Sequence, residues 1–252
     1  IIQTTLPGMT AQLASKDTSQ PTYRLMQMNL RFDNPTPEAT LSLIGAARPD
    51  VVTLAEVSDM WRERLGLLEA AYPYRVICPK PSHIGGTAIL SRRPFVEGFE
   101  PHCGDRGSFA KIRIDLGGRE IEIATLHMGW PWPFEQPWQM PRLIPLLENV
   151  GHDAIIAGDL NAVPWSHAAR RITEASGAQI LRGIGPSWLD RRLPDQLRPL
   201  IGLPIDNLML KGDVIATGLQ RLANPGSDHM AILLEFSLSR PPEPEVTTIV
   251  SR

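Results

Sequence analysis

Carboxylate, amide and imidazole side chains lie beside short apolar segments at six places along this chain. The groups are Asn29, Glu56, His127, Asp159 with Asn161, Asp206 with Asn207, and Asp228 with His229. Each group alone has a simpler explanation, because Asn and Asp form turns, a histidine can be satisfied when half-buried, and a glutamate can pair with an arginine. Six such groups in one chain indicate a shared site at the ends of strands.

The oxygen-bearing side chains of this set could bind a hard divalent cation. Mg²⁺ takes a few carboxylate or carbonyl oxygens and completes its shell with water and phosphate. Glu56, Asn29 and Asp228 would provide such a site, with Glu56 as the principal ligand, and no cluster of cysteine and histidine indicates zinc. We therefore expect Mg²⁺ or Mn²⁺ as the cofactor.

The remaining groups suit the hydrolysis of a phosphate ester. This reaction needs an oriented water and stabilisation of the charge on the phosphoryl oxygens. Asp159 could hold the water, and Asn161 could donate a hydrogen bond to the phosphate. His229 could bind the phosphate as a cation if Asp206 holds its imidazole.

Strand and helix signals alternate from Tyr23 onward. Strands are expected at residues 23–29, 51–55, 87–90, 111–116, 119–127, 154–157, 208–210 and 230–236, and helices after Thr36, after Ser58 or Asp59, and at 166–175. Gly117-Gly118 between two alternating segments predicts a hairpin. Hairpins mixed with crossover helices indicate sheets that contain antiparallel pairs, with the helices outside.

Two apolar segments share one pattern. Residues 50–56 and 153–159 each begin with an acid, continue as an apolar strand and end in an acid. Two ordinary buried strands would explain the apolar residues but not the acid at both ends. We expect these strands to bring carboxylates to one edge of a two-sheet core.

The length and composition are those of one folded domain. The chain has 252 residues, 42% of them hydrophobic and 21% charged, and no run of about 18 apolar residues predicts a membrane span. We expect a linker at 1–21, one catalytic domain at 22–237 and a tail at 238–252. The net charge of −2 excludes a broad basic footprint for duplex nucleic acid, but not a nuclease whose site is made positive by a metal. Cys78 and Cys103 allow one bridge or two free thiols.

Together the motifs resemble the endonuclease/exonuclease/phosphatase superfamily, which includes deoxyribonuclease, abasic-site exonucleases, sphingomyelinases and inositol-polyphosphate 5-phosphatases. The matching segments, in the family's order, are Asn29-Leu30, LAEV at 54–57, GGTAILSR at 85–92, TLH at 125–127, GDLN at 158–161, Ile205-Asp206 and Ser227-Asp228-His229. The resemblance covers about residues 22–237. It implies a four-layer α/β sandwich, with two packed mixed β-sheets flanked by helices and the site at the sheet edges.

The resemblance gives each group at a strand end a role in metal-dependent hydrolysis. The implied metal ligand is Glu56, with Asn29 nearby and Asp228 contributing. The implied groups around the phosphate are Asp159 for the water, Asn161 and His229 as phosphate contacts, Asp206 as the support of His229, and His127 on the leaving-group side or orienting the phosphate.

Arg31 departs from the pattern of several nucleases in the family, which have an acid at this position. The change removes a possible metal ligand, and we expect the arginine to bind substrate phosphate; the alternative is a structural salt bridge. The segments NLRFDN at 29–34 and HMGWPWP at 127–133 resemble a bacterial subgroup of undefined substrate. Members often carry an apolar segment before this domain, so we expect an exported or membrane-tethered domain with its anchor upstream of Ile1.

Residues 128–145 contain Trp130, Trp132 and Trp138 among five prolines. We expect a stiff loop whose rings either stack on a base or sugar, insert at a lipid interface, or cover the sheet edge as core, and the sequence does not distinguish these alternatives. The leading function is a nuclease-like phosphodiesterase. The alternatives are hydrolysis of a phospholipid headgroup, a phosphomonoesterase, and a binding module for phosphorylated ligands without turnover. We expect no obligate protein partner.

Overall fold

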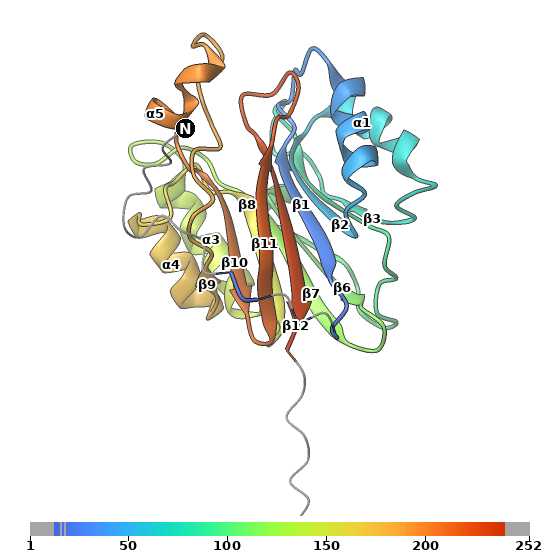
Figure 1. The fold of residues 1–252 in the computed structure, drawn as a ribbon. Coiled ribbons are helices and arrows are strands. Elements are labelled where there is room, and N and C mark those ends of the chain that lie inside the picture. Colours follow the sequence, from blue (N-terminus) through green and yellow to red (C-terminus); the bar gives the residue numbers. More distant parts are fainter. Residues whose placement is uncertain (1–12, 16, 18, 240–252) are drawn as a thin grey trace, which may run out of the picture.

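The computed structural model describes residues 13–15, 17 and 19–239 and arranges them as two β-sheets with helices on both outer faces (Figure 1). Most of the expected linker at 1–21 and of the expected tail at 238–252 lies outside these residues. The first sheet has the order β11 (Val214–Leu222), β12 (Ala231–Leu238), β1 (Tyr23–Asn29), β2 (Val51–Val57), β4 (Gly86–Ser91) and β3 (Tyr74–Ile77). The second has the order β5 (His102–Gly104), β6 (Phe109–Asp115), β7 (Glu120–His127), β8 (Ala154–Asp159), β10 (Asp206–Lys211) and β9 (Gln179–Ile180).

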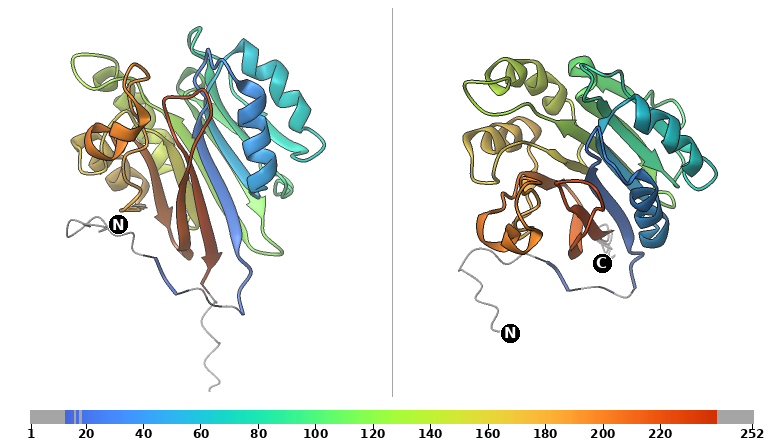
Figure 2. Two further views of the ribbon diagram at one scale, coloured as in Figure 1. Left: turned by 45° about the horizontal axis from the view of Figure 1, so that its top comes forward. Right: turned by 90° about the horizontal axis from the view of Figure 1, so that it is seen from above.

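The helices lie on opposite sides of this pair of sheets, as the view from above shows (Figure 2). The first sheet is covered by α1 (Pro37–Ala47) and α2 (Asp59–Arg64), and the second by α3 (Gln136–Glu148) and α4 (His167–Ser176). A short helix α5 (Arg198–Ile201) and 3-10 turns at Leu65–Leu68, Asp105–Gly107 and Asp195–Leu197 complete the elements. The expected four-layer α/β sandwich is confirmed.

Three apolar clusters hold the layers together. One lies between the two sheets, and each of the others lies between a sheet and its helices. Side chains alternate between them along the central strands. On β8, for example, Ile155 belongs to the central cluster and Ile156 to the outer cluster against α3 and α4. Both faces of these strands are therefore buried, as their apolar sequences predict.

The two sheets repeat one local arrangement. In the first, β1 and β2 are parallel, α1 connects them, and β12 and β4 flank them antiparallel. In the second, β7 and β8 are parallel, α3 connects them, and β6 and β10 flank them antiparallel. The shared sequence pattern at residues 50–56 and 153–159 therefore marks equivalent strands, β2 and β8.

Several local predictions are confirmed at the level of the backbone. β6 and β7 pair antiparallel around Gly117 and Gly118, whose φ angles of 75° and 92° suit glycine. Helix α4 begins after Ser166, whose side chain accepts a hydrogen bond from the Ala169 backbone N–H, and it ends at Gly177 with φ 70°. The strands β3, β5, β9 and β11 were not expected from the sequence.

The proline-rich segment contains a helix, where we expected a loop throughout residues 128–145. Helix α3 starts with Pro137 in its first turn and contains Pro141 and Pro145. These three prolines are four residues apart and all exposed, so the hydrogen bonds they remove lie along one solvent-facing side of the helix. Its other side, with Met140 and Leu143, packs in the outer core of the second sheet.

The two cysteines form a disulfide, which settles the choice left open by their number. Cys78 follows β3 in the first sheet, and Cys103 lies on β5 in the second. The bond therefore joins the two sheets covalently at one side of the sandwich.

Candidate active site at the sheet edges

Strand direction brings the predicted residues to one edge of the sandwich. In the parallel pair of β7 and β8, His127 lies opposite Asp159, and in the antiparallel pair of β8 and β10, Asp206 also lies opposite Asp159. Asn29 ends β1, and His229 lies just before β12, which runs antiparallel to β1. Residues two apart on a strand share a face, so Asn29 and Asp159 continue the inward-facing rows that contain Leu25 and Ile155.

Asp159 lies at the centre of the site and is buried. Its Oδ2 accepts a hydrogen bond from Asn29 Nδ2 at 3.0 Å and lies 3.6 Å from His229 Nε2 and 3.8 Å from His127 Nε2. Its Oδ1 accepts a hydrogen bond from the Asn161 backbone N–H at 2.8 Å. Both carboxylate oxygens of Asp159 are therefore directed toward residues that the sequence analysis predicted to be in the site.

Glu56 reaches the site through a backbone irregularity. The pairing of β2 with β4 shifts register between Leu54 and Val57, and Glu56 has φ 59°. Its Oε1 accepts a hydrogen bond from Asn29 Nδ2 at 3.0 Å, and its Oε2 accepts one from the Phe32 N–H at 2.8 Å. A bulge of this kind redirects a side chain next to many active sites. Here it brings the Glu56 carboxylate to the Asn29 amide that also bonds Asp159.

His229 and Asp206 form a buried pair. His229 Nδ1 and Asp206 Oδ2 are 2.7 Å apart. Burial alone would lower the pKa of His229, but the Asp206 and Asp159 carboxylates outweigh it and raise this pKa to about 10. The imidazole is therefore a cation at neutral pH, as expected for a phosphate contact.

The carboxyl group of Asp159 has a raised pKa. Burial is the main cause, the nearby Asp206 adds to it, and His229 and His127 act in the opposite direction. A divalent cation in the same cavity would favour the ionised form of Asp159.

These side chains open into a cavity of about 450 Å³. The predicted residues that line it are Glu56, His127, Asp159, Asn161, Asp228 and His229. Asn29 and Asp206 are buried and contact the lining residues by hydrogen bonds. The structure thus brings eight of the nine predicted residues into one site.

Arg31 is the exception. Its Nε bonds Asp33 Oδ1 at 2.7 Å, and its Nη1 donates to the Gly226 carbonyl at 2.9 Å. With Asp190 and Arg191 it lines another cavity of about 230 Å³, which shares Asp228 with the catalytic cavity. The guanidinium is thus used in local contacts, which favours the structural alternative and does not support the expected contact with substrate phosphate.

Sequence reasoning did not single out several residues of the cavity, among them Trp188 and Arg106. Trp188 donates from Nε1 to Asp228 Oδ2 at 3.2 Å, and its ring makes an edge contact with Trp130, with centroids 5.8 Å apart. Arg106 also lines the cavity and lies on the turn between β5 and β6. Neither follows a recognisable apolar strand, so no pattern in the sequence pointed to them.

The donor set fits a hard cation. Glu56 and Asp228 share the cavity, and no lysine or arginine among the described residues forms an ion pair with either carboxylate. Asp159, Asp206 and His229 also place ligand atoms within 4.8 Å of one another. Imidazole must be neutral to bind a metal, and its carboxylate neighbours oppose this in His229, so the set with Glu56, Asn29 and Asp228 fits better.

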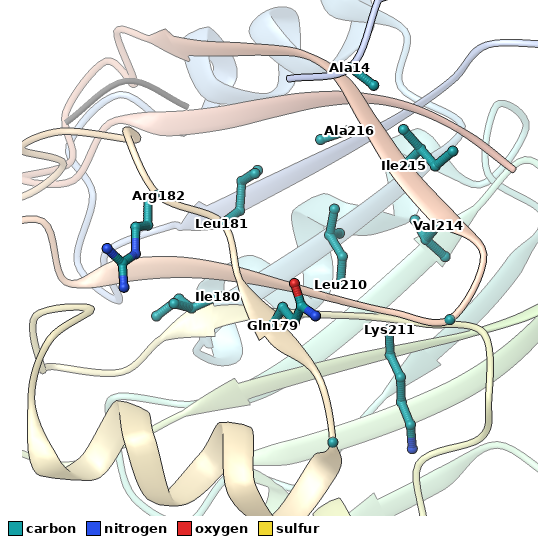
Figure 3. Close-up of a pocket in the computed structure, with 12 residues that line it drawn as sticks. Ala14, Gln179, Ile180, Leu181, Arg182, Leu210, Lys211, Val214, Ile215 and Ala216 are labelled. Atoms are coloured by element: carbon teal, nitrogen blue, oxygen red, sulfur yellow. The ribbon is translucent and has the colours of Figure 1, made fainter. Parts of the chain in front are cut away.

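A second cavity, of about 280 Å³, lies at the other end of β10 from Asp206 (Figure 3). It lies between β9, β10 and β11, and aliphatic side chains such as Leu181 and Leu210 form much of its wall. Its polar side chains are Gln179, Arg182 and Lys211, with no carboxylate or histidine among the described residues that line it. This cavity lacks the groups that phosphate hydrolysis requires.

Comparison with known proteins identifies the family. Residues 26–229 match the Endonuclease/Exonuclease/phosphatase family, which covers most of the chain and all of the site. The chain belongs to this family. As a member of the endonuclease/exonuclease/phosphatase family it is a metal-dependent phosphoesterase, and the expected hydrolase activity is confirmed at this level. Its place in a bacterial subgroup stays a prediction.

One relative and two solved structures illustrate the similarity. The inositol phosphosphingolipids phospholipase C of Saccharomyces cerevisiae is 28% identical over 156 residues, or 51% of this chain and 33% of that protein, so the match spans about a third of the relative's length. TDP2 of D. rerio, in complex with a single-strand DNA product, has a TM-score of 0.68 and 16% identity, over 86% of this chain and 99% of that one. Beta toxin of Staphylococcus aureus with bound magnesium has a TM-score of 0.59 and 14% identity, over 87% and 100%.

Proposed function

We propose that this protein is a metal-dependent phosphodiesterase that cleaves the headgroups of phospholipids or sphingolipids at a membrane surface. The observation that carries this proposal is a group of exposed aromatic side chains on the two segments that follow His127 and Asp159, of which Trp130 also lines the catalytic cavity. We call it the aromatic rim; it consists of Trp130, Trp132, Phe134, Trp138 and Trp165.

The aromatic rim lies on two segments that belong to the site. Residues 128–138 follow His127, and residues 160–166 follow Asp159. Asn161 Nδ2 donates to the Met128 carbonyl at 2.7 Å, and Gln136 Nε2 donates to the Leu160 carbonyl at 2.8 Å, so hydrogen bonds tie the segments together. The rim therefore keeps a fixed position next to the reacting groups.

The exposure of these rings is unusual. Trp132 is 80% exposed, Trp165 70% and Trp138 65%, and among the described residues Tyr74 is the one exposed aromatic side chain outside the rim. Exposed apolar groups that cluster at a site indicate an interaction surface. Tryptophan has an apolar ring with a polar N–H, which suits the boundary between lipid tails and headgroups.

No helix of the described residues is long and apolar enough to cross a membrane.

The site residues take the following roles in this proposal. Asp159 orients the attacking water, Asn161 and His229 contact the phosphate, and Asp206 holds His229 protonated. His127 lies on the leaving-group side. Glu56, Asn29 and Asp228 would hold Mg²⁺ or Mn²⁺, which supplies positive charge to the phosphoryl oxygens when bound.

Two further facts support this assignment. The yeast relative that the chain resembles over 156 residues is named as a phospholipase C for inositol phosphosphingolipids. A disulfide between the sheets suits an oxidising compartment, as expected for an exported domain.

The test separates membrane binding from chemistry. The double variant Trp132→Ala/Trp138→Ala should lose most binding to phosphatidylcholine–sphingomyelin vesicles and most hydrolysis of their lipids, but should cleave soluble bis(4-nitrophenyl) phosphate like the unmodified protein. Tyr74→Ala, which removes an exposed ring elsewhere, is the matched control. Chelation or Glu56→Gln should abolish both reactions, because both use the same metal. Equal loss of the soluble and vesicle activities in the tryptophan variant would contradict the proposal, as would an absence of lipid hydrolysis by the intact protein.

A nuclease is the second candidate. The edge contact of Trp130 with Trp188 forms an aromatic wall inside the cavity, on which a nucleobase could stack. Single-stranded DNA and RNA offered beside the vesicles decide between the candidates. Faster cleavage of the nucleic acids, with loss on Trp188→Ala but not on the rim variant, would favour the nuclease.

A further inference from the structure

One cation in the catalytic cavity has no partner of its own. Arg106 lines the cavity, and among the described residues no side chain or carbonyl forms an ion pair or hydrogen bond with its guanidinium. We propose that Arg106 forms a subsite for a second anionic group of the substrate, carried by the headgroup next to the scissile phosphate. This inference rests on the proposed lipid phosphodiesterase activity and adds a preference for acidic headgroups.

The turn that carries Arg106 has an unusual backbone conformation, which contacts from neighbouring residues hold in place. Asp105 and Arg106 have φ angles of 43° and 59°, in the left-handed region that side chains other than glycine rarely adopt. Gly107 follows with φ 101°, and a Cβ there would lie 1.7 Å from the Pro79 carbonyl oxygen. Strain of this kind persists only where surrounding contacts enforce it, and it is common at binding sites.

Asp105 provides those contacts. Its side chain is buried and accepts hydrogen bonds from Gln139 Nε2 at 2.8 Å, from the Ser108 hydroxyl and from Arg142 Nε. Two of these donors are on α3, so the turn is tied to a helix of the second sheet. The backbone of the turn at Arg106 is therefore held in place by its neighbours.

Among the described residues, no acid near the turn forms an ion pair with the exposed side chain of Arg106. Arg142 pairs with Asp105 and neutralises it. Glu135, another acid of the cavity, accepts a hydrogen bond from the Trp130 N–H at 3.2 Å. The guanidinium of Arg106 can consequently offer its N–H groups to an oxyanion in the cavity.

The order of the strands indicates which anion this would be. The turn precedes β6, which lies two strands from β8, or about 10 Å from the strand that ends in Asp159. β7, which ends in His127, lies between them. Arg106 thus lies on the far side of β7, and of His127 at its end, from the strand that ends in Asp159. We assign this position to a second anionic group of the headgroup, a phosphate or a carboxylate, in a cavity that Ser82 also lines.

Binding of two small ligands tests the subsite without turnover. 3-Phosphoglycerate and glycerol 3-phosphate differ by a carboxylate in place of a hydroxymethyl group. By calorimetry with Mg²⁺ present, the intact protein should bind the first at least about tenfold more tightly, since a hydrogen bond to a charged group contributes that much. Arg106→Gln should remove the preference and leave the affinity for glycerol 3-phosphate unchanged. Arg106→Lys should retain part of it, and Arg182→Gln, at the other cavity, should retain all of it.

Kinetics with soluble short-chain lipids then identify the source of the anion. Phosphatidylserine should be cleaved with a higher kcat/KM than phosphatidylcholine, and Arg106→Gln should remove this difference through KM. The thermal midpoint should not change, because the guanidinium has no internal partner. Equal weakening of both small ligands would overturn the proposal by placing Arg106 on the scissile phosphate, and so would no change at all.

The subsite and the proposed function can fail separately. If the carboxylate preference depends on Arg106 but no lipid is cleaved, the lipid activity fails and the anion subsite stands. If the preference appears for a dinucleotide with a terminal phosphate over one without it, and for no lipid, the headgroup assignment is overturned.

Discussion

At the scale of single residues, the pKa values of Asp159 and His229 depend on each other and on the Asp206 carboxylate. Asp159 and Asp206 both act on His229, from 3.6 Å and 2.7 Å, and raise its pKa against the effect of burial. In return, Asp206 helps to raise the pKa of Asp159. The state needed for hydrolysis has Asp159 ionised and His229 protonated, so activity should be confined between the pKa values of these two groups.

Replacing Asp206 should shift the pH range of activity to lower pH. In Asp206→Asn, the lost negative charge lowers the pKa of His229, so the alkaline limb of the kcat profile moves to lower pH. The pKa of Asp159 also falls, so the acid limb moves in the same direction. Rates for bis(4-nitrophenyl) phosphate measured across pH, with the His229 shift followed by NMR, check both limbs. Asp213→Asn, at the far end of β10, is the control, and an unmoved alkaline limb in Asp206→Asn would contradict the assignment of His229.

The same change should affect folding stability with a defined pH dependence. The folded pKa of His229 lies above its ordinary value of 6.5, so the pair stabilises the fold fully below about pH 6.5 and loses this contribution as pH rises through the folded pKa. The stability difference between the intact protein and Asp206→Asn should therefore shrink in alkaline solution.

Sequence reasoning found the residues at the ends of apolar strands, but it could not predict the contacts that irregular backbone gives to some side chains. Asn29 and Asp159 follow strands whose apolar pattern is clear, so their location was predictable. Glu56 was predicted from its position after the apolar run, but the bulge that directs it was not visible. The contacts of Arg31 and Arg106 depend on loops with positive φ, for which the sequence contains no periodic signal.

At the scale of elements, strands buried on both faces were predictable and edge strands were not. β2 and β8 are continuous apolar runs, whereas β5 and β9 are two or three residues long and derive their structure from pairing with a neighbour. Helix α3 was hidden by its prolines, because proline in a helix interior removes a hydrogen bond and clashes with the preceding turn, and so usually indicates the end of a helix. Their four-residue spacing places the lost hydrogen bonds on the exposed side of α3.

The disulfide should be a major contribution to stability. Cys78 and Cys103 are 25 residues apart, and closing a loop of this size stabilises a fold by about 3 kcal/mol through the unfolded chain. Urea unfolding of Cys78→Ala/Cys103→Ala should give a free energy of unfolding lower by about this amount. Dithiothreitol should reproduce the loss in the intact protein and have no effect on the variant. Equal urea midpoints for the oxidised and the reduced protein would show that the disulfide is not needed for the native packing.

At the scale of the whole molecule, the site is shared by both sheets. Asn29 and Glu56 come from the first sheet, and Asp159, His127 and Asp206 from the second. The hydrogen bond from Asn29 to Asp159 and the one between His229 and Asp206 both cross from one sheet to the other. The central cluster beneath them sets the spacing of the sheets.

Two neighbouring isoleucines on β8 allow a test of whether the activity depends on the spacing of the two sheets. Ile155→Ala and Ile156→Ala remove the same atoms from buried positions, so each should lower the free energy of unfolding by about 2–5 kcal/mol. Ile155 lies between the sheets, whereas Ile156 faces α3 and α4. Under conditions where both variants are folded, kcat should fall in Ile155→Ala and remain near the original value in Ile156→Ala. Equal kcat values would mean that the site tolerates changes in sheet spacing.

The hydrogen bonds between the sheets also bear on how this protein can change over evolutionary time. A substitution in either outer cluster acts mainly on folding stability, so the core-facing residues of α1, α2 and α4 can diverge as long as their sheets stay covered. A substitution in the central cluster affects both stability and activity, because it also alters the separation of Asn29 from Asp159. Neutral drift should therefore be fast in the outer layers and slow between the sheets, even though residues in all three clusters are equally hidden from solvent.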